Sequence, residues 1–384
     1  MHPLYGQMET SVFERMSLAA AKYGAVNLGQ GFPDFGWPED ILQAAARAVV
    51  EGSNQYPPSR GLPALRDAVA AHYGRHQGLG LASENICITS GATEALAAAI
   101  LATVEPGDEV IVLTPAYDAY VPLIRRAGGT PIEVALQPPG WRIERSALEA
   151  AISPQTRAIV FNNPHNPTGR LFDRDELAAI AAVAVINDLI VISDEVWEHT
   201  LLDGQSFTPI ASMAGMTERT LKCGSAGKIF SLTGWKIGWL VASPELATLV
   251  ARAHQFLTFA SAPNLQAAVA FGLNDGDDWL HPMRERFARA RNRMTSGLEA
   301  AGYAVLPSAS TYFLCVDLAA SGIALDDESF AARAVEEAGV AVVPLSPFAE
   351  QDRARHLIRL CFAKRDETID AGVAALARAR EMMS

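Results

Sequence analysis

Cysteine and lysine are both scarce in this 384-residue sequence. The four cysteines lie far apart and form no CxxC pair; they are Cys87, Cys223, Cys315 and Cys361. This distribution argues against a disulfide framework and is typical of buried thiols in a reducing compartment. We therefore expect a cytoplasmic protein whose cysteines pack in the core and take no part in catalysis.

Long hydrophobic runs and a net positive charge are also missing. The longest apolar stretch, 177–186, ends at Asn187 and Asp188 and is far shorter than the roughly 20 residues of a membrane span. Residues 1–6 contain no basic segment leading into an apolar run, so no secretory signal is apparent. The formal net charge of −12 disfavours nucleic acid and anionic membrane surfaces as main partners. A soluble protein with neither partner is expected.

The few lysines are unevenly placed. There are five lysines against twenty-six arginines, and Lys222, Lys228 and Lys236 fall within fifteen residues. Lys228 follows a glycine and has serine, glycine and aromatic residues around it, which is unusual for a solvated lysine. A partly buried lysine can lose its proton near neutral pH, attack a carbonyl and hold an aldehyde as a Schiff base, whereas arginine cannot. The sequence therefore predicts that Lys228 is a covalent anchor.

The middle of the chain alternates short β-rich runs with helical segments. Strands are expected at 86–89, 109–113, 157–161, 189–193, 220–223 and 237–241. Helices are expected at 38–52, 93–104, 173–185 and 244–257. This spacing predicts an α/β fold with a mainly parallel sheet between two layers of helices. Ligands in such folds bind at the carboxyl ends of the strands.

From about residue 274 the pattern changes. A long Arg-rich helix is expected through Gly302, followed by strands at 303–306, 312–316, 341–343 and 356–361, a helix near 328–337 and a final helix. We interpret this part as a smaller α+β domain that the N-terminal segment helps to complete. The expected division is residues 1–40 as N-terminal arm and part of the small domain, 41–274 as the large domain, and 275–384 as the small C-terminal domain.

Three polar motifs follow predicted strands. Ser90–Glu94 opens a helix, whose free backbone amides could hold a phosphate, although a serine or threonine there also serves as an ordinary cap. Asn162–Gly169 is a rigid turn whose amides could bind a ligand, or simply an Asx-rich turn. Asp194 ends a buried strand and either faces a cation or protonated nitrogen or caps a helix. Together with Lys228, these motifs fit pyridoxal 5′-phosphate, a phosphorylated aldehyde with a basic ring nitrogen.

At this point the chain resembles the fold-type-I pyridoxal-phosphate aminotransferases of class I. Within them it is most similar to the branch of kynurenine, glutamine and methionine aminotransferases and cysteine-conjugate β-lyases. The residues that carry the resemblance are Asn27–Asp34, Asn54–Tyr56, Asn162–Gly169, Ser193–Val196, Gly224–Trp239 and Ile358–Phe362. The resemblance implies a large domain with a mainly parallel seven-stranded sheet between helices, a smaller α+β domain, and a homodimer with shared active sites.

The resemblance also implies roles for individual residues. Lys228 matches the catalytic lysine, Asp194 the partner of the pyridine nitrogen, and Asn166 the donor to the ring hydroxyl. The other positions that match cofactor contacts are Gly91, Ala92, Thr93, Ser225 and Lys236 at the phosphate, Tyr117 and Asn162 at the ring, and Tyr56 at the phosphate of the neighbouring subunit. Arg359 matches the residue that binds the substrate α-carboxylate, with Gly31 and Asn166 nearby. No metal site is expected.

Two positions depart from the family pattern. Trp197 stands where tyrosine is common, and an indole can donate a hydrogen bond but cannot accept one. Ala260 stands where some members have histidine. Trp197 is still expected to contact the cofactor, but the side-chain specificity of those members does not carry over.

The predicted activity is transfer of the α-amino group of a neutral or aromatic L-amino acid, of the kynurenine, glutamine, methionine or phenylalanine type, to a 2-oxo acid by a ping-pong mechanism. An N-succinyldiaminopimelate aminotransferase and a cysteine-conjugate C–S β-lyase are the alternatives within the enzyme class. A ligand-sensing module of a transcription regulator is disfavoured, because the family match begins near Asn27 and leaves no room for a preceding DNA-binding domain. A catalytically silent relative is disfavoured by the presence of Lys228, Asp194 and Arg359.

Overall fold

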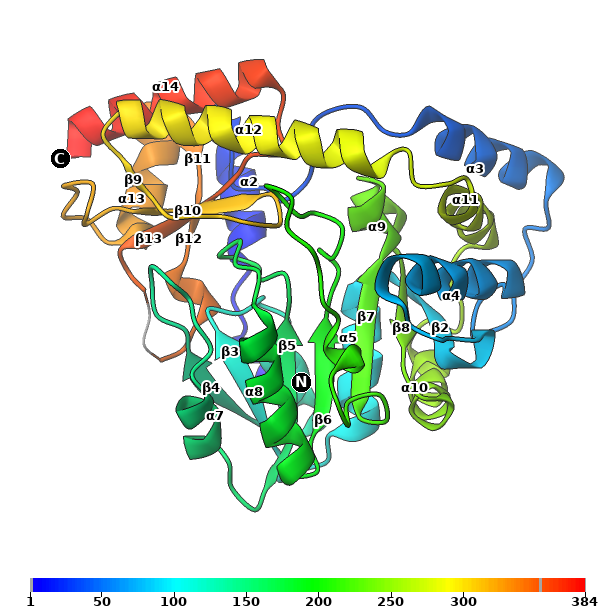
Figure 1. Ribbon diagram of the computed structural model, residues 1–384. Coiled ribbons are helices and arrows are strands. Elements are labelled where there is room, and N and C mark those ends of the chain that lie inside the picture. Colours follow the sequence, from blue (N-terminus) through cyan, green and yellow to red (C-terminus); the bar gives the residue numbers. More distant parts are fainter. Residues whose placement is uncertain (1–2, 352–353, 384) are drawn as a thin grey trace.

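The centre of the protein is a seven-stranded mixed sheet, seen in a computed structural model that describes residues 3–351 and 354–383 (Figure 1). The strand order is β2-β8-β7-β6-β5-β3-β4. The strands are β2 (Ile86–Ser90), β3 (Glu109–Thr114), β4 (Thr130–Ala135), β5 (Thr156–Asn162), β6 (Ile190–Asp194), β7 (Thr220–Ser225) and β8 (Ile237–Val241). All neighbours pair in parallel except β8, which is antiparallel to both β7 and β2. The predicted α/β class is confirmed.

Alternating side chains bury both faces of this sheet. Val110 and Val112 of β3 pack into one helix layer, whereas Ile111 and Leu113 pack into the other. The first layer contains α5 (Gly91–Thr103), α6 (Tyr120–Ala127) and α10 (Pro244–Leu257). The second contains α7 (Arg145–Ala150) and α8 (Arg174–Ile186), with α3 (Glu39–Glu51), α4 (Pro63–Gln77) and α11 (Pro263–Asn274) beyond them over β2 and β8. A parallel sheet with two apolar faces requires this double cover.

The smaller part of the molecule combines both ends of the chain. Its strands are β9 (Ala304–Val305), β10 (Phe313–Asp317), β12 (Val343–Pro344) and β13 (Leu357–Cys361), in the order β12-β13-β10-β9. The N-terminal β1 (Val26–Asn27) pairs in parallel with β11 (Val340–Ala341). The helices of this part are α2 (Val12–Tyr23), α12 (Leu280–Ala300), α13 (Asp327–Arg333) and α14 (Asp366–Met383).

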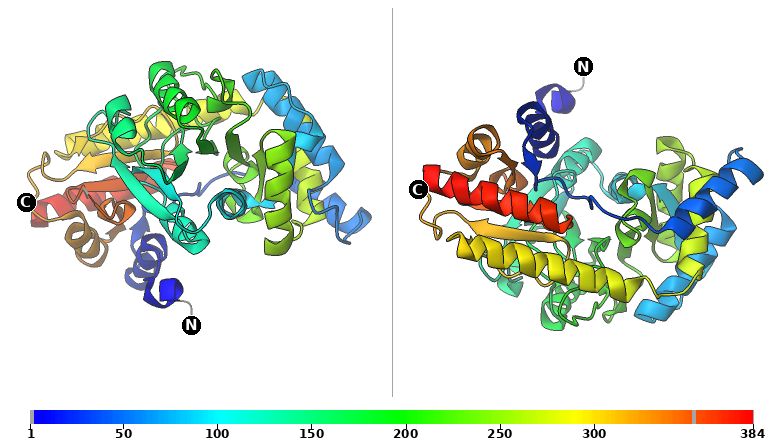
Figure 2. Two further views of the ribbon diagram at one scale, coloured as in Figure 1. Left: turned by 90° about the horizontal axis from the view of Figure 1, so that it is seen from below. Right: turned by 90° about the horizontal axis from the view of Figure 1, so that it is seen from above.

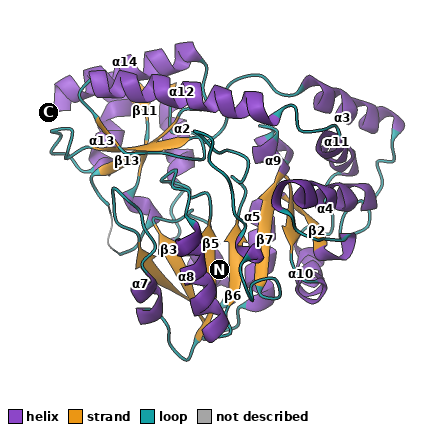
Figure 3. Cartoon of the chain, in the orientation of Figure 1, coloured by secondary structure: helices purple, strands orange, loops and turns teal. Residues whose placement is uncertain are grey.

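Helix α12 joins the two parts of the molecule. It starts near α9 (Ala226–Ile229) and α11 (Figure 1) and runs alongside α14 over the smaller sheet (Figure 2). The cartoon coloured by secondary structure shows the same division, with the large sheet below and the smaller one beneath α12 and α14 (Figure 3). The remaining short elements are α1 (Pro3–Gln7), α9 (Ala226–Ile229), 3₁₀ turns at Ser83–Asn85, Ile210–Ser212, Thr233–Trp235 and Ser346–Phe348, and a π-helical turn at Ala334–Ala338. No helix in residues 3–351 or 354–383 is long and apolar enough to span a bilayer.

Most predicted elements are present within two residues of their expected ends, but the single strand predicted at 341–343 is wrong. The structure has two short strands there, β11 and β12, which belong to different sheets. Val340 and Ala341 pair with β1, whereas Val343 and Pro344 pair with β13. The continuous apolar run reflects burial of every residue from Val340 to Val343, and it carries no sign of the change of partner.

A buried ion cluster lies between β7 and the segment that follows β6. Lys222 of β7 forms ion pairs with Glu195 and with Glu198, the latter at 2.6 Å between Nζ and Oε2. Tyr73 and Gln77 of α4 donate hydrogen bonds to Glu198 at 2.8 and 2.5 Å. Burial alone would lower the pKa of Lys222, but the two carboxylates raise it above its ordinary value. The cluster therefore holds the segment after Asp194 against β7 and α4.

We predict that Lys222→Met lowers the free energy of unfolding by about 3–5 kcal/mol, because it leaves two buried carboxylates without their cation. Urea unfolding followed by circular dichroism measures the loss. The exposed Lys22→Met is the matched control and should leave the midpoint close to that of the wild type. Equal midpoints for both variants would contradict a structural role for the cluster.

Candidate active site

The ends of five strands meet at one edge of the large sheet. Because β2, β5, β6 and β7 point the same way, their last residues Ser90, Asn162, Asp194 and Ser225 lie along that edge. Strand β8 runs in the opposite direction, so its start brings Lys236 to the same place. Residues spread from position 90 to position 236 of the sequence are thereby collected in one region.

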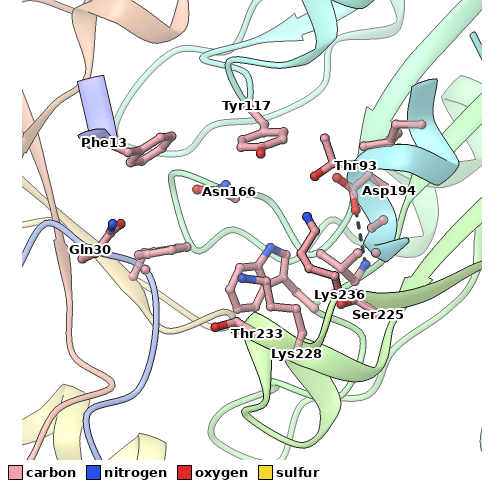
Figure 4. Close-up of a pocket in the computed structure, with 18 of the residues that line it drawn as sticks. Phe13, Gln30, Thr93, Tyr117, Asn166, Asp194, Ser225, Lys228, Thr233 and Lys236 are labelled. Carbon is pink, nitrogen blue, oxygen red and sulfur yellow. Dashed lines mark hydrogen bonds between the residues drawn. The ribbon is translucent and has the colours of Figure 1, made fainter. Parts of the chain in front are cut away.

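A pocket of about 290 Å³ opens at this edge. Twelve of the fourteen predicted site residues line it: Gly31, Gly91, Ala92, Thr93, Tyr117, Asn166, Asp194, Trp197, Ser225, Lys228, Lys236 and Arg359. Thr93, Ser225 and Lys236 gather at one end of the pocket, whereas Phe13 and Gln30 lie at the other (Figure 4). Lys228 and Asn166 lie between the two ends.

Asn162 does not line the pocket but holds its wall in place. Its side-chain oxygen accepts a hydrogen bond of 2.6 Å from the backbone N–H of Asn166. Its side-chain nitrogen donates one of 2.8 Å to the carbonyl of Asp194. The second bond is buried and the first partly buried, and together they connect the turn after β5 to the end of β6. Asn162 therefore fixes the positions of two pocket residues.

Tyr56 lies outside the pocket as well. Its side chain is 86% exposed, and its ring meets the ring of Phe259 edge-on, with 5.5 Å between centroids. Phe256 is equally exposed, and Leu257 and Phe259 are partly exposed. Large exposed apolar side chains close together are typical of a contact surface.

Lys228 projects into the pocket from α9, directly after β7. Its Nζ lies 3.2 Å from the hydroxyl of Tyr312 and 4.6 Å from the centroid of a Trp197 ring. Burial lowers the pKa of its ammonium from 10.5 to about 8, and the positive charges of Arg359 and Lys236 act in the same direction, against the pull of Asp194. The amine is thus available as a nucleophile or base near neutral pH.

Asp194 is a buried carboxylate with one strong hydrogen-bond donor. The hydroxyl of Tyr120 donates to its Oδ2 at 2.7 Å, and the backbone N–H of Val196 contacts Oδ1 at 3.4 Å. Burial raises the pKa of Asp194, although these donors and the nearby lysines oppose the rise. A cationic partner in the pocket would stabilise its charged form.

The end of the pocket near α5 is suited to an anion. The first residues of this 13-residue helix, Gly91, Ala92 and Thr93, line the pocket and present the positive end of the helix. Lys236 lies opposite, with a φ of 55° that is uncommon for a residue with a side chain. Gly91 has a φ of 74°, and a Cβ there would come within 3.2 Å of Lys236 Cε. Ser90 makes no side-chain capping hydrogen bond, so the simple capping role considered for this motif is not observed.

Arg359 lies in β13 at the boundary between the two parts of the molecule. Its side chain donates hydrogen bonds to the side-chain oxygen of Asn166 at 2.9 Å and to the carbonyl of Gly29 at 3.0 Å. Its guanidinium carbon lies 3.9 Å from the centroid of the Phe313 ring. Burial lowers the pKa of Arg359 to about 10. No partner among the described residues bonds to Nε, which leaves a buried donor for an anionic ligand.

Two tyrosines of this site were not predicted as site residues. Tyr120 holds Asp194, and Tyr312 both accepts from Lys228 and donates to the carbonyl of Gly31 at 2.5 Å. Tyr120 follows Tyr117 by three residues at the start of α6, which is a weak sequence signal. Tyr312 precedes an apolar strand, and nothing in its local sequence indicates that it reaches Lys228, 84 residues away. Its phenol lies next to Trp197, with 4.4 Å between ring centroids.

Comparisons with known proteins agree with this geometry. Residues 23–376 match the family described as "Aminotransferase class I and II". The chain is 44% identical to a probable N-succinyldiaminopimelate aminotransferase of Mycobacterium tuberculosis, over 96% of this chain and 95% of that protein, and 37% identical to the methionine aminotransferase of Escherichia coli, over 98% and 97%. The solved structure of N-succinyldiaminopimelate aminotransferase from Mycobacterium tuberculosis superimposes with a TM-score of 0.95 at 43% identity and covers 99% of this chain and 100% of that one. The chain therefore belongs to the class I and II aminotransferases, has their type I fold, and is an enzyme of the transaminase class.

Proposed function

We propose that the protein is a pyridoxal 5′-phosphate-dependent aminotransferase that moves the α-amino group of a neutral or aromatic L-amino acid to a 2-oxo acid. The observation that carries this proposal is the convergence of Lys228, Asp194 and Arg359 on one pocket with an anion-binding end. A nucleophilic amine, a buried carboxylate and an open guanidinium are the three groups this chemistry requires at fixed positions.

The residues of the pocket fit pyridoxal phosphate, which the family also implies. The start of α5 with Ser225 and Lys236 would hold the phosphate, and Tyr117 would lie against the ring. The Asp194 carboxylate would pair with the ring nitrogen, and Asn166 would meet the ring hydroxyl. When bound, this cofactor supplies an electron sink for the charge released at the substrate Cα.

The side chains of this chain perform the remaining tasks. Arg359, with Asn166 bonded to it, binds and orients the substrate α-carboxylate, so that the Cα–H bond faces Lys228. The amine of Lys228 takes up the Cα proton and holds it as an ammonium. Tyr312 holds that amine in place and, through Gly31, ties it to the substrate end of the pocket. Two such half-reactions, first with an amino acid and then with a 2-oxo acid, complete a ping-pong cycle.

A neutral side chain suits the substrate end of the pocket. Phe13 and Phe313 line that end, and Gln30 adds an uncharged polar group. Among the residues that the structure describes, Arg359 is the only arginine in the pocket lining. It is committed to the α-carboxylate, so a second carboxylate on the substrate would have no guanidinium partner among the described residues that line the pocket.

N-succinyldiaminopimelate is the second candidate substrate. The 44% identity over 96% of the chain to the probable N-succinyldiaminopimelate aminotransferase favours it. This substrate carries its additional carboxylates far from the α-carbon, so their partners would lie at the pocket mouth and not beside Arg359.

We further propose a cytoplasmic homodimer in which Tyr56 reaches the pocket of the second subunit. The exposure of Tyr56, Phe256 and Phe259 supports this arrangement. Residues 41–274 would form the large cofactor-binding domain. Residues 1–40 and 275–384 would form the N-terminal arm and the small domain. Of these, residues 1–2, 352–353 and 384 lie outside the described part of the chain.

The proposed activity can be tested by spectroscopy with a substrate panel. We expect purified protein with added pyridoxal phosphate to show the visible band of the lysine-bound cofactor, and methionine, glutamine, kynurenine or phenylalanine to bleach it. Lys228→Ala should lack the band. Coupled assays with 2-oxoglutarate then rank these amino acids against N-succinyl-LL-diaminopimelate. Preference for the latter would select the second candidate, and no band in the wild type would contradict the cofactor assignment.

The lowered pKa of Lys228 predicts the pH dependence of cofactor capture. Only the unprotonated amine attacks an aldehyde, so the capture rate should rise with pH, level off above about 8, and fall roughly tenfold per pH unit below that value. The capture rate is measured by stopped-flow absorbance after apo-protein is mixed with pyridoxal phosphate. The reference is Nα-acetyllysine, whose ε-amine is free. An inflexion near the ordinary lysine pKa of 10.5 would contradict the effect of burial.

Replacement of the planar guanidinium should impair substrate binding more than the fold. We expect Arg359→Lys to reduce kcat/KM at least about 100-fold, because lysine cannot form the bidentate contact with a carboxylate. The exposed Arg174→Lys is the matched control and should retain wild-type kinetics. Retention of the cofactor band in Arg359→Lys would show that the loss is in substrate binding. Unchanged kcat/KM would remove Arg359 from the proposed role.

A further inference from the structure

A second group of polar side chains lies outside the pocket described above. His72 and His76 stand one turn apart on α4 and therefore project from the same face of that helix. His199 follows β6, and Asp277 lies between α11 and α12. None of these four residues lines the active-site pocket. The group thus joins three segments that are far apart in the sequence.

The spacing of the side chains is close to that of a metal site. His76 Nε2 lies 2.9 Å from Asp277 Oδ1, and His72 Nε2 lies 2.8 Å from His199 Nε2. His72, His76 and Asp277 each offer one possible ligand atom, and these three atoms lie within 4.8 Å of one another. Ligands around a tetrahedral Zn²⁺ with bonds of about 2.0–2.1 Å are separated by about 3.3 Å. Small ring rotations would therefore bring these atoms onto one ion.

Buried nitrogens in this group have no partner. His72 is completely buried and His199 almost so, and the Nδ1 atoms of both rings lack a hydrogen bond to any described residue. Neutral imidazole is the form that ligates metals. The unpartnered Nδ1 of His72 is a buried ring nitrogen that a ligand could satisfy.

Charge and access are also suitable. Asp277 supplies a negative charge. Three positive side chains nearby oppose the binding of a cation. Arg75 lies 3.7 Å from Asp277 Oδ2, and Arg284 donates a hydrogen bond to the carbonyl of His199. The third, Lys222, is already neutralised by Glu195 and Glu198. A cavity of about 210 Å³ lined by His76, Glu198 and His199 reaches the group. The side chains of His76 and Asp277 are 17% and 37% exposed, which gives an ion a route to the buried rings.

We propose that His72, His76 and Asp277 bind one divalent transition-metal ion of the zinc type. Two imidazoles and one carboxylate favour zinc, cobalt or nickel over calcium and magnesium, which prefer oxygen ligands. The ion would be structural, because it fixes α4 to the turn that precedes α12. It would thereby anchor the helix that joins the two parts of the molecule.

Cobalt substitution tests this proposal with a readout independent of aminotransferase activity. Purified full-length protein is stripped with EDTA, dialysed and titrated with Co²⁺. We expect one equivalent to bind and to give the intense visible absorption of tetrahedral cobalt. Zn²⁺ should displace the colour and raise the thermal midpoint, because an ion that binds only the folded state stabilises it.

Ligand variants locate the site. His76→Gln and Asp277→Asn, both at partly exposed positions, should bind Co²⁺ at least about tenfold more weakly and lose the absorption. His281→Gln, in an 83% exposed side chain of α12, is the matched control and should bind as the wild type does. Absence of the absorption in the wild type, or its survival in both His76→Gln and Asp277→Asn, would overturn the proposal. Loss of colour in His281→Gln alone would overturn it as well.

Discussion

The direction of the strands in the large sheet is the constraint on which the site depends. Parallel pairing of β5, β6 and β7 aligns Asn162, Asp194 and Ser225 at one edge, and the reversed β8 returns Lys236 to that edge. If β8 ran parallel to its neighbours, its first residue would lie at the opposite edge. The anion-binding end of the pocket would then lose its lysine. The single antiparallel strand within an otherwise parallel sheet thus has a direct chemical consequence.

Burial supplies the second physical element. The same low-polarity surroundings lower the pKa values of Lys228 and Arg359 and raise that of Asp194. Each shift is a free-energy penalty on a charged group, and a ligand with complementary charges relieves it. Next to the pocket, the charge of Lys222 is balanced by the carboxylates of Glu195 and Glu198, which leaves one net negative charge. These ion pairs hold the segment around Trp197 and involve no residue that lines the pocket. The two groups of buried charges are neighbours. The charges of the Lys222 cluster are paired within the protein, whereas those of Lys228, Arg359 and Asp194 await a ligand.

Much of the fold could be predicted because its signals are local. Strand β8 and helix α10 have the predicted bounds, since an apolar run and a Ser-Pro helix start are written in consecutive residues. The split of 340–344 between two sheets could not be predicted. Strand β11 pairs with β1, more than 300 residues earlier, whereas β12 pairs with the nearby β13, and the local sequence shows neither partner. The pocket residues followed from strand-end motifs and the family resemblance. Tyr120 and Tyr312 did not, because each acts through a hydroxyl whose partner is distant in sequence.

The sequence by itself determined the class of fold, the lysine that stands apart from an arginine-rich background, and the motifs that mark the strand ends. These depend on residue type and short-range periodicity, which folding does not alter. Only the tertiary structure decided that Asn162 supports the pocket wall and does not line it, that Arg359 keeps an open donor, and that His72, His76 and Asp277 meet. Distances between side chains from separate segments are set by strand order and helix packing, and no local sequence pattern contains them.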